Sequence, residues 1–127
     1  MSVLLLAGIV IAGCDSMPGD GGTSSIRGKV YVQVYNESNI LYQQYYVQDE
    51  KVFLIYGDGT TFDDDTRTSY DGSYSFKYLR KGTYQVYAYS DCPTCVNSGL
   101  IEPILLEVEI TKNNQEVVLP DIVIEKH

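Results

Sequence analysis

Two cysteines with a proline between them lie in the segment YSDCPTC, residues 89–95. Such a Cys-x-x-Cys pair serves as a thiol–disulfide active site, as part of a metal site, or as a disulfide that closes a loop. Redox enzymes place the pair at the start of a helix, whereas Cys92 and Cys95 follow a strand-like segment. The carboxylate of Asp91 would disfavour a reactive thiolate. We therefore expect a structural disulfide, with thiol–disulfide exchange or metal binding as alternatives.

Carboxylates are concentrated in GDGTTFDDDTRTSYDG, residues 57–72. Oxygen-rich loops bind Ca²⁺, but the spacing here differs from the calcium-loop pattern Asp-x-Asp-x-Asp-Gly followed by a distant Glu. We expect these side chains to form turns and to face solvent, without a resident metal. The weak calcium candidates are Asp58, Asp63, Asp64 and Asp65.

The sequence offers little material for catalysis. Its one histidine is His127, and it has neither a nucleophile elbow nor a glycine-rich phosphate loop. We therefore expect no enzyme activity, no catalytic residues and no cofactor. The formal net charge of −8 repels phosphate backbones, which argues against nucleic-acid binding.

Tyrosine is unusually frequent, with twelve residues and no tryptophan in the chain. Aromatic surfaces bind sugars or act as hot spots of protein interfaces, although tyrosine also simply suits half-exposed strands. The candidate ligand surface comprises Tyr31, Tyr35, Tyr87 and Tyr89. Glycan binding predicts that exposed tyrosines gather on one sheet face.

Apolar and polar residues alternate at every second position in most segments after residue 25, the period of a half-buried strand. A loop or a further strand is expected at 36–50, and Pro120 indicates an edge or a bulge. About seven short strands with intervening turns predict one all-β domain, an antiparallel sandwich. The predicted strands are 26–35, 51–56, 73–78, 82–90, 103–111 and 116–125.

The chain begins with an uncharged, almost wholly apolar run over residues 3–13. This run is too short to span a bilayer and has the length of a signal-peptide core. The residues Ile11-Ala12-Gly13-Cys14 resemble the bacterial lipobox, which implies that Cys14 is acylated and begins the mature chain. The alternatives are an ordinary signal peptide cut near Ala12, or a buried strand.

The composition of residues 15–25, rich in Gly, Ser and Asp, is typical of a flexible tether. We therefore expect a signal peptide at 1–13, a lipidated cysteine and tether at 14–25, and a domain at 26–124. Export would place Cys92 and Cys95 in an oxidising compartment, where disulfides persist.

The segment TSYDGSYSFKYLRKGTYQVYAYS, residues 68–90, resembles the pattern shared by carboxypeptidase regulatory-like and Cna B-type domains. The resemblance implies a seven-stranded, Greek-key, transthyretin-like (prealbumin-like) β-sandwich that usually has no enzymatic role. Some Cna B-type domains join a lysine to an asparagine, but the last strand offers no asparagine to Lys29. The matching residues are Thr68, Asp71, Gly72, Tyr74, Phe76, Leu79, Gly82, Tyr84 and Val86.

These observations predict a non-catalytic, lipid-anchored structural or protein-binding module of a bacterial cell envelope, at the periplasmic or surface face of the outer membrane. The first alternative is an accessory lipoprotein that binds glycan or peptide. The second is a thiol–disulfide oxidoreductase, which requires an exposed Cys92. The expected partners are the membrane, through the lipid, and an envelope protein or glycan.

Overall fold

The computed structural model describes residues 17–127, so the predicted signal peptide and Cys14 lie outside the described residues. Among the residues described, no helix is long and apolar enough to cross a bilayer. The elements are β1 (Asp20–Tyr35), β2 (Leu41–Tyr46), β3 (Lys51–Tyr56), β4 (Asp64–Arg67), β5 (Ser73–Leu79), β6 (Gly82–Asp91), the 3₁₀ turn η1 (Val96–Ser98), β7 (Ile101–Ile110), β8 (Glu116–Val118) and β9 (Ile122–Lys126).

The first sheet is built around the long strand β1. Val30 donates its N–H to the Gly72 carbonyl at 2.9 Å and accepts from the Val47 N–H at 3.0 Å, so both bonds lie on one side of β1. Strands β5 and β2 therefore follow one another along that edge, antiparallel to β1. Along the other edge, β8 and β9 run parallel to β1.

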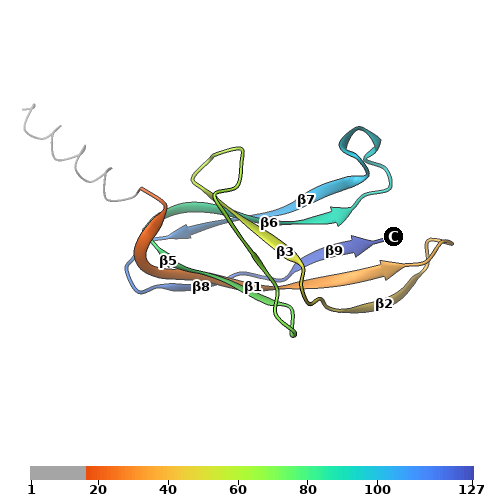
Figure 1. The fold of residues 1–127 in the computed structure, drawn as a ribbon, viewed down its shortest axis with the longest axis horizontal. Helices are drawn as coiled ribbons and strands as arrows, with labels where there is room; N and C mark the ends of the chain where they lie inside the picture. Colours follow the sequence, from red (N-terminus) through yellow and green to blue (C-terminus); the bar gives the residue numbers. More distant parts are fainter. Residues whose placement is uncertain (1–16) are drawn as a thin grey trace, which may run out of the picture.

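The second sheet has the order β4-β3-β6-β7 and is antiparallel throughout. Its longest ladder joins β6 to β7, from Gly82 opposite Ile110 to Asp91 opposite Ile101. Figure 1 shows β6 and β7 in one layer, with β1 running along the other. This two-sheet, all-β arrangement is consistent with a β-sandwich.

The core lies between the two sheets, because alternate residues of each strand point inward. Among the described residues, every member of this core lies between Ile26 and Ile124, so a protein of residues 17–127 retains all of this core. The most deeply buried large side chains are Tyr84, Ile26, Leu54, Ile110, Ile122 and Ile124.

Most predicted strands are present, but the predicted count and direction are wrong. Nine strands occur in the described residues in place of seven, and one sheet is mixed. Strand β2 occupies part of the uncertain segment 36–50, and β4 lies inside the acidic loop. The single strand predicted at 116–125 is divided at Leu119-Pro120-Asp121 into β8 and β9, because proline cannot donate to the ladder.

The predicted tether is shorter than expected, because β1 begins at Asp20 rather than near Ile26. A Cβ on Gly22 would overlap the Leu79 carbonyl oxygen, so glycine permits a close backbone approach there. The Ser24 hydroxyl donates to the Lys112 carbonyl at 2.8 Å. Gly22, one of the glycines that indicated flexibility, is thus needed for backbone packing.

The turn predicted at Asp71-Gly72 is confirmed and is held by its own side chains. Gly72 donates its N–H to the Ser69 carbonyl at 2.9 Å. Oδ1 of Asp71 accepts from the Ser73 hydroxyl at 2.6 Å, the Ser69 hydroxyl at 2.9 Å and the Ser73 N–H at 3.1 Å. The bonds from Ser73 and Ser69 favour the carboxylate and lower the pKa of Asp71 to about 2.

This turn should contribute a distinct part of the acid sensitivity of folding. A depressed pKa in the folded state gives stability that is complete above the unfolded value, about 3.9, and is lost as pH falls toward about 2. Asp71→Asn should therefore flatten the dependence of unfolding free energy on pH in that window. Urea unfolding between about pH 5 and about pH 2 measures it. Asp58→Asn is the matched control, and an equal flattening there would contradict the role of the turn.

Candidate functional site

The candidate tyrosines are divided between the outer faces of the two sheets. Tyr31 and Tyr35 belong to β1. The Tyr31 ring contacts the Tyr46 ring edge-on, with centroids 5.0 Å apart, and the Tyr35 ring stacks on His127, with centroids 4.7 Å apart. Tyr87 and Tyr89 belong to β6 in the second sheet. The prediction of one surface containing all four was wrong, because β1 and β6 lie in different sheets.

Four aromatic side chains, Phe53, Phe62, Tyr87 and Tyr89, form a cluster on the outer face of the second sheet, here called the aromatic face. Phe53 lies opposite Tyr87 in the ladder and stacks on it, with centroids 4.9 Å apart and planes 15° apart. The rings of Phe62 and Tyr89 contact the Phe53 ring edge-on, with centroid distances of 4.9 and 5.6 Å. Such pairs hold ring positions before any ligand arrives.

Sequence reasoning missed Phe53 and Phe62. Strand β3 is apolar at every position between Lys51 and Tyr56, so its period does not distinguish the inward from the outward side chains. The continuous apolar run of β3 was a signal for these aromatic contacts, because a strand that is apolar on both sides requires apolar neighbours on both faces of the sheet.

Next to the aromatic face lies a mainly apolar hollow of about 300 Å³. Ile55 forms part of its floor and is only 5% exposed, although it lies on the outer face. Tyr89 is 39% exposed and Leu105 is 42% exposed, so both remain available to a ligand. The hollow is lined by Ile55, Gly59, Thr60, Gln85, Tyr87, Tyr89, Pro103 and Leu105.

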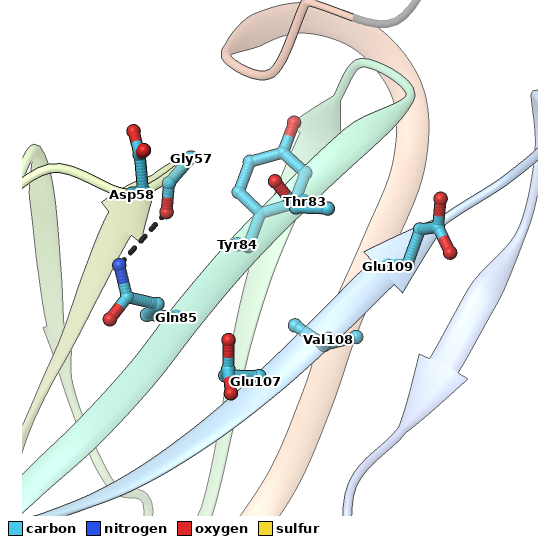
Figure 2. Close-up of a pocket in the computed structure, with 8 residues that line it drawn as sticks. All are labelled: Gly57, Asp58, Thr83, Tyr84, Gln85, Glu107, Val108 and Glu109. Atoms are coloured by element: carbon cyan, nitrogen blue, oxygen red, sulfur yellow. Dashed lines mark hydrogen bonds between the residues drawn. The ribbon is translucent and has the colours of Figure 1, made fainter.

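A second hollow of about 450 Å³ adjoins the first, and Gln85 lines both. Figure 2 shows residues of β6 and β7 beside the loop that follows β3, with the Gln85 amide directed at that loop. Gln85 Nε2 donates to the Gly57 carbonyl at 2.9 Å, which holds the loop against β6. This hollow is lined by Gly57, Asp58, Thr83, Tyr84, Gln85, Glu107, Val108 and Glu109.

The two hollows together form what we call the outer groove. One end offers aromatic and aliphatic surface, and the other offers the carboxylates of Asp58, Glu107 and Glu109. Carboxylates accept hydrogen bonds and repel anions, while ring faces bind apolar C–H surface. The groove therefore suits a neutral or cationic ligand that has both an apolar face and hydroxyl or amino donors.

His127 lies away from this groove. Its Nε2 atom is 2.8 Å from Glu125 Oε1, and its ring stacks on Tyr35 of the first sheet. Within residues 17–127, the outer groove contains no imidazole and no cysteine thiol. Its lining offers ring faces, the Gln85 amide and carboxylates, which can contact a ligand and form hydrogen bonds with it.

The predicted disulfide between Cys92 and Cys95 is confirmed. It lies in the connection from β6 to β7, where Cys92 donates its N–H to the Leu100 carbonyl at 2.7 Å. Cys92 is only 8% exposed. The acid Glu102 lies beside the two sulfur atoms, but both of these belong to the disulfide and are not thiolate ligands.

Two of the four calcium candidates, Asp63 and Asp64, accept hydrogen bonds from backbone N–H groups. Asp63 Oδ2 accepts from the Tyr56 N–H at 2.7 Å, and Asp64 Oδ1 accepts from the Asp65 N–H at 2.8 Å. Asp58 lies in the outer groove. In the part of the chain that the structure describes, these carboxylates do not converge to the distance that metal ligands require.

No family model matches the chain, and no curated protein matches it. A candidate carbohydrate-binding protein from Pseudomonas aeruginosa, known from a crystal structure at 2.61 Å resolution, is similar over 80% of this chain and 90% of that chain. The identity is 16% and the TM-score is 0.47. A likeness of this degree carries no inference about the ligand of this chain.

Proposed function

We propose that the protein is a non-catalytic, lipid-anchored component of a bacterial cell envelope that binds neutral oligosaccharide in the outer groove. The observation that carries this proposal is the combination, on one sheet face, of stacked aromatic rings with amide and carboxylate groups. Among the alternatives raised by the sequence, it favours glycan binding over a purely structural role.

The chemistry of a sugar ring matches both ends of the groove. A pyranose has an apolar C–H face that would contact Tyr89 and Leu105, and hydroxyls that would donate to Glu107. Contacts within the aromatic face keep its rings in place, so binding orders few side chains and loses little entropy. The carboxylates disfavour sugars that carry sulfate, phosphate or carboxylate groups.

The lipid anchor rests on the lipobox resemblance at Cys14. Five residues, 15–19, separate Cys14 from β1 and would span at most about 18 Å when fully extended. A Cβ placed on Gly57 would lie 3.6 Å from Pro18, so the acidic end of the groove is close to the start of the domain. The groove would thus lie within a few nanometres of the membrane surface.

Membership of the transthyretin-like class is part of the same proposal. The apolar positions of the 68–90 motif, Tyr74, Phe76, Leu79, Tyr84 and Val86, are all buried in the core. These are the positions at which the resemblance expects core residues. The mixed first sheet and the two additional strands among the described residues differ from the seven-stranded pattern.

Calorimetry with residues 17–127 and a panel of neutral oligosaccharides tests the proposed binding. Tyr89→Ala should weaken binding about tenfold, because a stacked ring contributes about 1–2 kcal/mol at about 25 cal/mol per Å² of apolar surface. Tyr31→Ala removes a tyrosine from the opposite face and should leave affinity unchanged. Equal losses in the two variants, or no binding to any oligosaccharide, would refute the proposal.

A redox titration separates this function from thiol–disulfide exchange. Because Cys92 is almost fully buried, we expect a reduction potential below about −300 mV, as in structural disulfides. Mass spectrometry of residues 17–127 in defined glutathione buffers counts the free thiols. A potential between about −120 and about −270 mV, the range of dedicated exchange proteins, would instead support the oxidoreductase alternative.

A further inference from the structure

Strand β2 has an unpaired edge. Among the described residues it pairs only with β1, and all six of its residues are exposed. Figure 1 shows β2 beside β1 at the lower margin of the molecule, whereas β6 and β7 belong to the other sheet. An exposed strand edge presents a row of free N–H and C=O groups that can pair with another strand.

The composition of β2 distinguishes it from the other strands at sheet edges. Its sequence, LYQQYY, contains no charged residue, no proline and no glycine. Each of the other five edge strands carries at least one charge: Asp64 in β4, Lys77 in β5, Glu102 in β7, Glu116 in β8 and Glu125 in β9. Charges and prolines disfavour edge pairing, so among the edge strands of residues 17–127 β2 alone lacks this protection.

The register of β2 on β1 determines which backbone groups are free. Val30 bonds with Val47, and bonded pairs recur at every second residue, so Val32 with Tyr45 and Val34 with Gln43 are also hydrogen-bonded pairs. The intervening residues Gln44 and Tyr46 therefore direct their N–H and C=O groups away from β1, while Tyr42 lies at a bulge between the pairs Val34–Gln43 and Tyr35–Leu41.

We propose that two copies of this chain associate by antiparallel pairing of β2 with β2, about a two-fold axis at Gln44. In an antiparallel ladder, the residues whose N–H and C=O groups face the free edge of one strand must pair with the corresponding residues of the other strand. Centring the axis on Gln44 places Tyr42 opposite Tyr46 of the second copy and Gln44 opposite its own equivalent. This register includes both regular outward residues of each strand, Gln44 and Tyr46, with Gln44 at its centre.

A second copy fits this edge better than a strand of different composition. An acidic chain repels itself at most surfaces, but LYQQYY places no charge opposite a charge when it pairs with itself. Tyr46 is already held by a 2.7 Å hydrogen bond to Asp121 and by Lys29, whose Nζ lies 4.9 Å from the ring centroid. The cross-strand aromatic pair with Tyr42 would therefore form at little further cost in entropy.

The pairing would join the first sheets of two protomers into one continuous sheet. The interface is isologous, so it closes as a dimer rather than extending into a filament. The outer groove lies on the second sheet and remains accessible in each copy. The dimer is therefore independent of the proposed glycan binding, and would present two grooves to a polymeric glycan.

Sedimentation velocity of residues 17–127 over a wide concentration range tests the dimer. The wild type should approach twice the monomer mass as concentration rises. Gln44→Lys and Gln44→Glu should each weaken dimerisation at least tenfold, because like charges then meet at the axis. An equimolar mixture of the two variants should restore the dimer, since opposite charges pair there.

Gln33→Lys is the matched control. Gln33 lies opposite Gln44 in the ladder, one strand away from the free edge, so the same charge there should leave the dimer intact. A wild type that stays monomeric at every concentration would overturn the proposal. A dimer that persists in Gln44→Lys, or a mixture that fails to dimerise, would also overturn it.

Discussion

Replacing Gly72 with alanine is expected to lower the free energy of unfolding by about 3 kcal/mol. Gly72 has φ of +82°, a left-handed conformation that costs L-residues roughly 1–2 kcal/mol. A Cβ there would also lie 2.8 Å from Tyr46 Cβ and 3.0 Å from the Val30 carbonyl oxygen. Relieving that overlap costs about a further 1–3 kcal/mol, because β5, β1 and β2 meet at this point.

Gly99→Ala separates the cost of the left-handed backbone from the cost of the steric overlap at Gly72. Gly99 has a similar φ of +75°, but a Cβ there would meet no atom within 4 Å. Its substitution should cost only about 1 kcal/mol, the backbone part alone. Urea unfolding of both variants measures the difference. Equal losses would show that the contact of Gly72 with Tyr46 and Val30 is not a constraint on the fold.

Tyr84→Phe is expected to cost about 2 kcal/mol, the second largest effect. The Tyr84 hydroxyl donates to the Arg80 carbonyl at 2.6 Å and accepts from the Gly19 N–H at 2.9 Å. Phenylalanine would fill nearly the same volume but would remove the hydroxyl that pairs with the Gly19 N–H and the Arg80 carbonyl. Leaving a buried polar group without a partner costs about 1–3 kcal/mol of stability. The same change would loosen the start of β1 beside the acidic hollow.

Tyr74→Phe provides a control with the opposite sign. Tyr74 is 3% exposed, and within the described residues its hydroxyl has no hydrogen-bond partner. Removing that unsatisfied oxygen should therefore stabilise the fold by about 1 kcal/mol. Thermal and urea unfolding of both variants measures the contrast. A neutral Tyr84→Phe would contradict the role of its hydroxyl in fixing Gly19.

The sequence predicts well those elements whose pattern is local. Strands β3, β5 and β6 lie within a residue of their predicted bounds. Burial on one face imposes a period of two on β5 and β6, and β3 is a short continuous apolar run that ends at a turn. Parallel pairing of β8 and β9 with β1 was missed, since side-chain period does not depend on strand direction. Strand β2 was ambiguous because both its faces are exposed, so burial imposes no alternation on it.

The binding site could be predicted only in part. Tyr87 and Tyr89 were identified because they alternate with core residues along β6. Their contact with Phe53 depends on the β3–β6 register, which places Phe53 opposite Tyr87, a residue far away in the sequence. The sequence did not indicate that Gln85 would line the binding site. Gln85 holds the loop that follows β3 through a hydrogen bond to the Gly57 carbonyl, which forms only in the folded chain.

The most direct test of glycan binding is an NMR titration of isotope-labelled residues 17–127 with a neutral oligosaccharide. Binding in the outer groove predicts concentration-dependent shifts of the amide signals of Gln85, Tyr87, Tyr89 and Leu105, with those of Tyr31 and Gln33 unchanged. Shifts confined to the first sheet, or a spectrum that stays unchanged with every sugar tested, would contradict the assignment of the outer groove as a glycan-binding site.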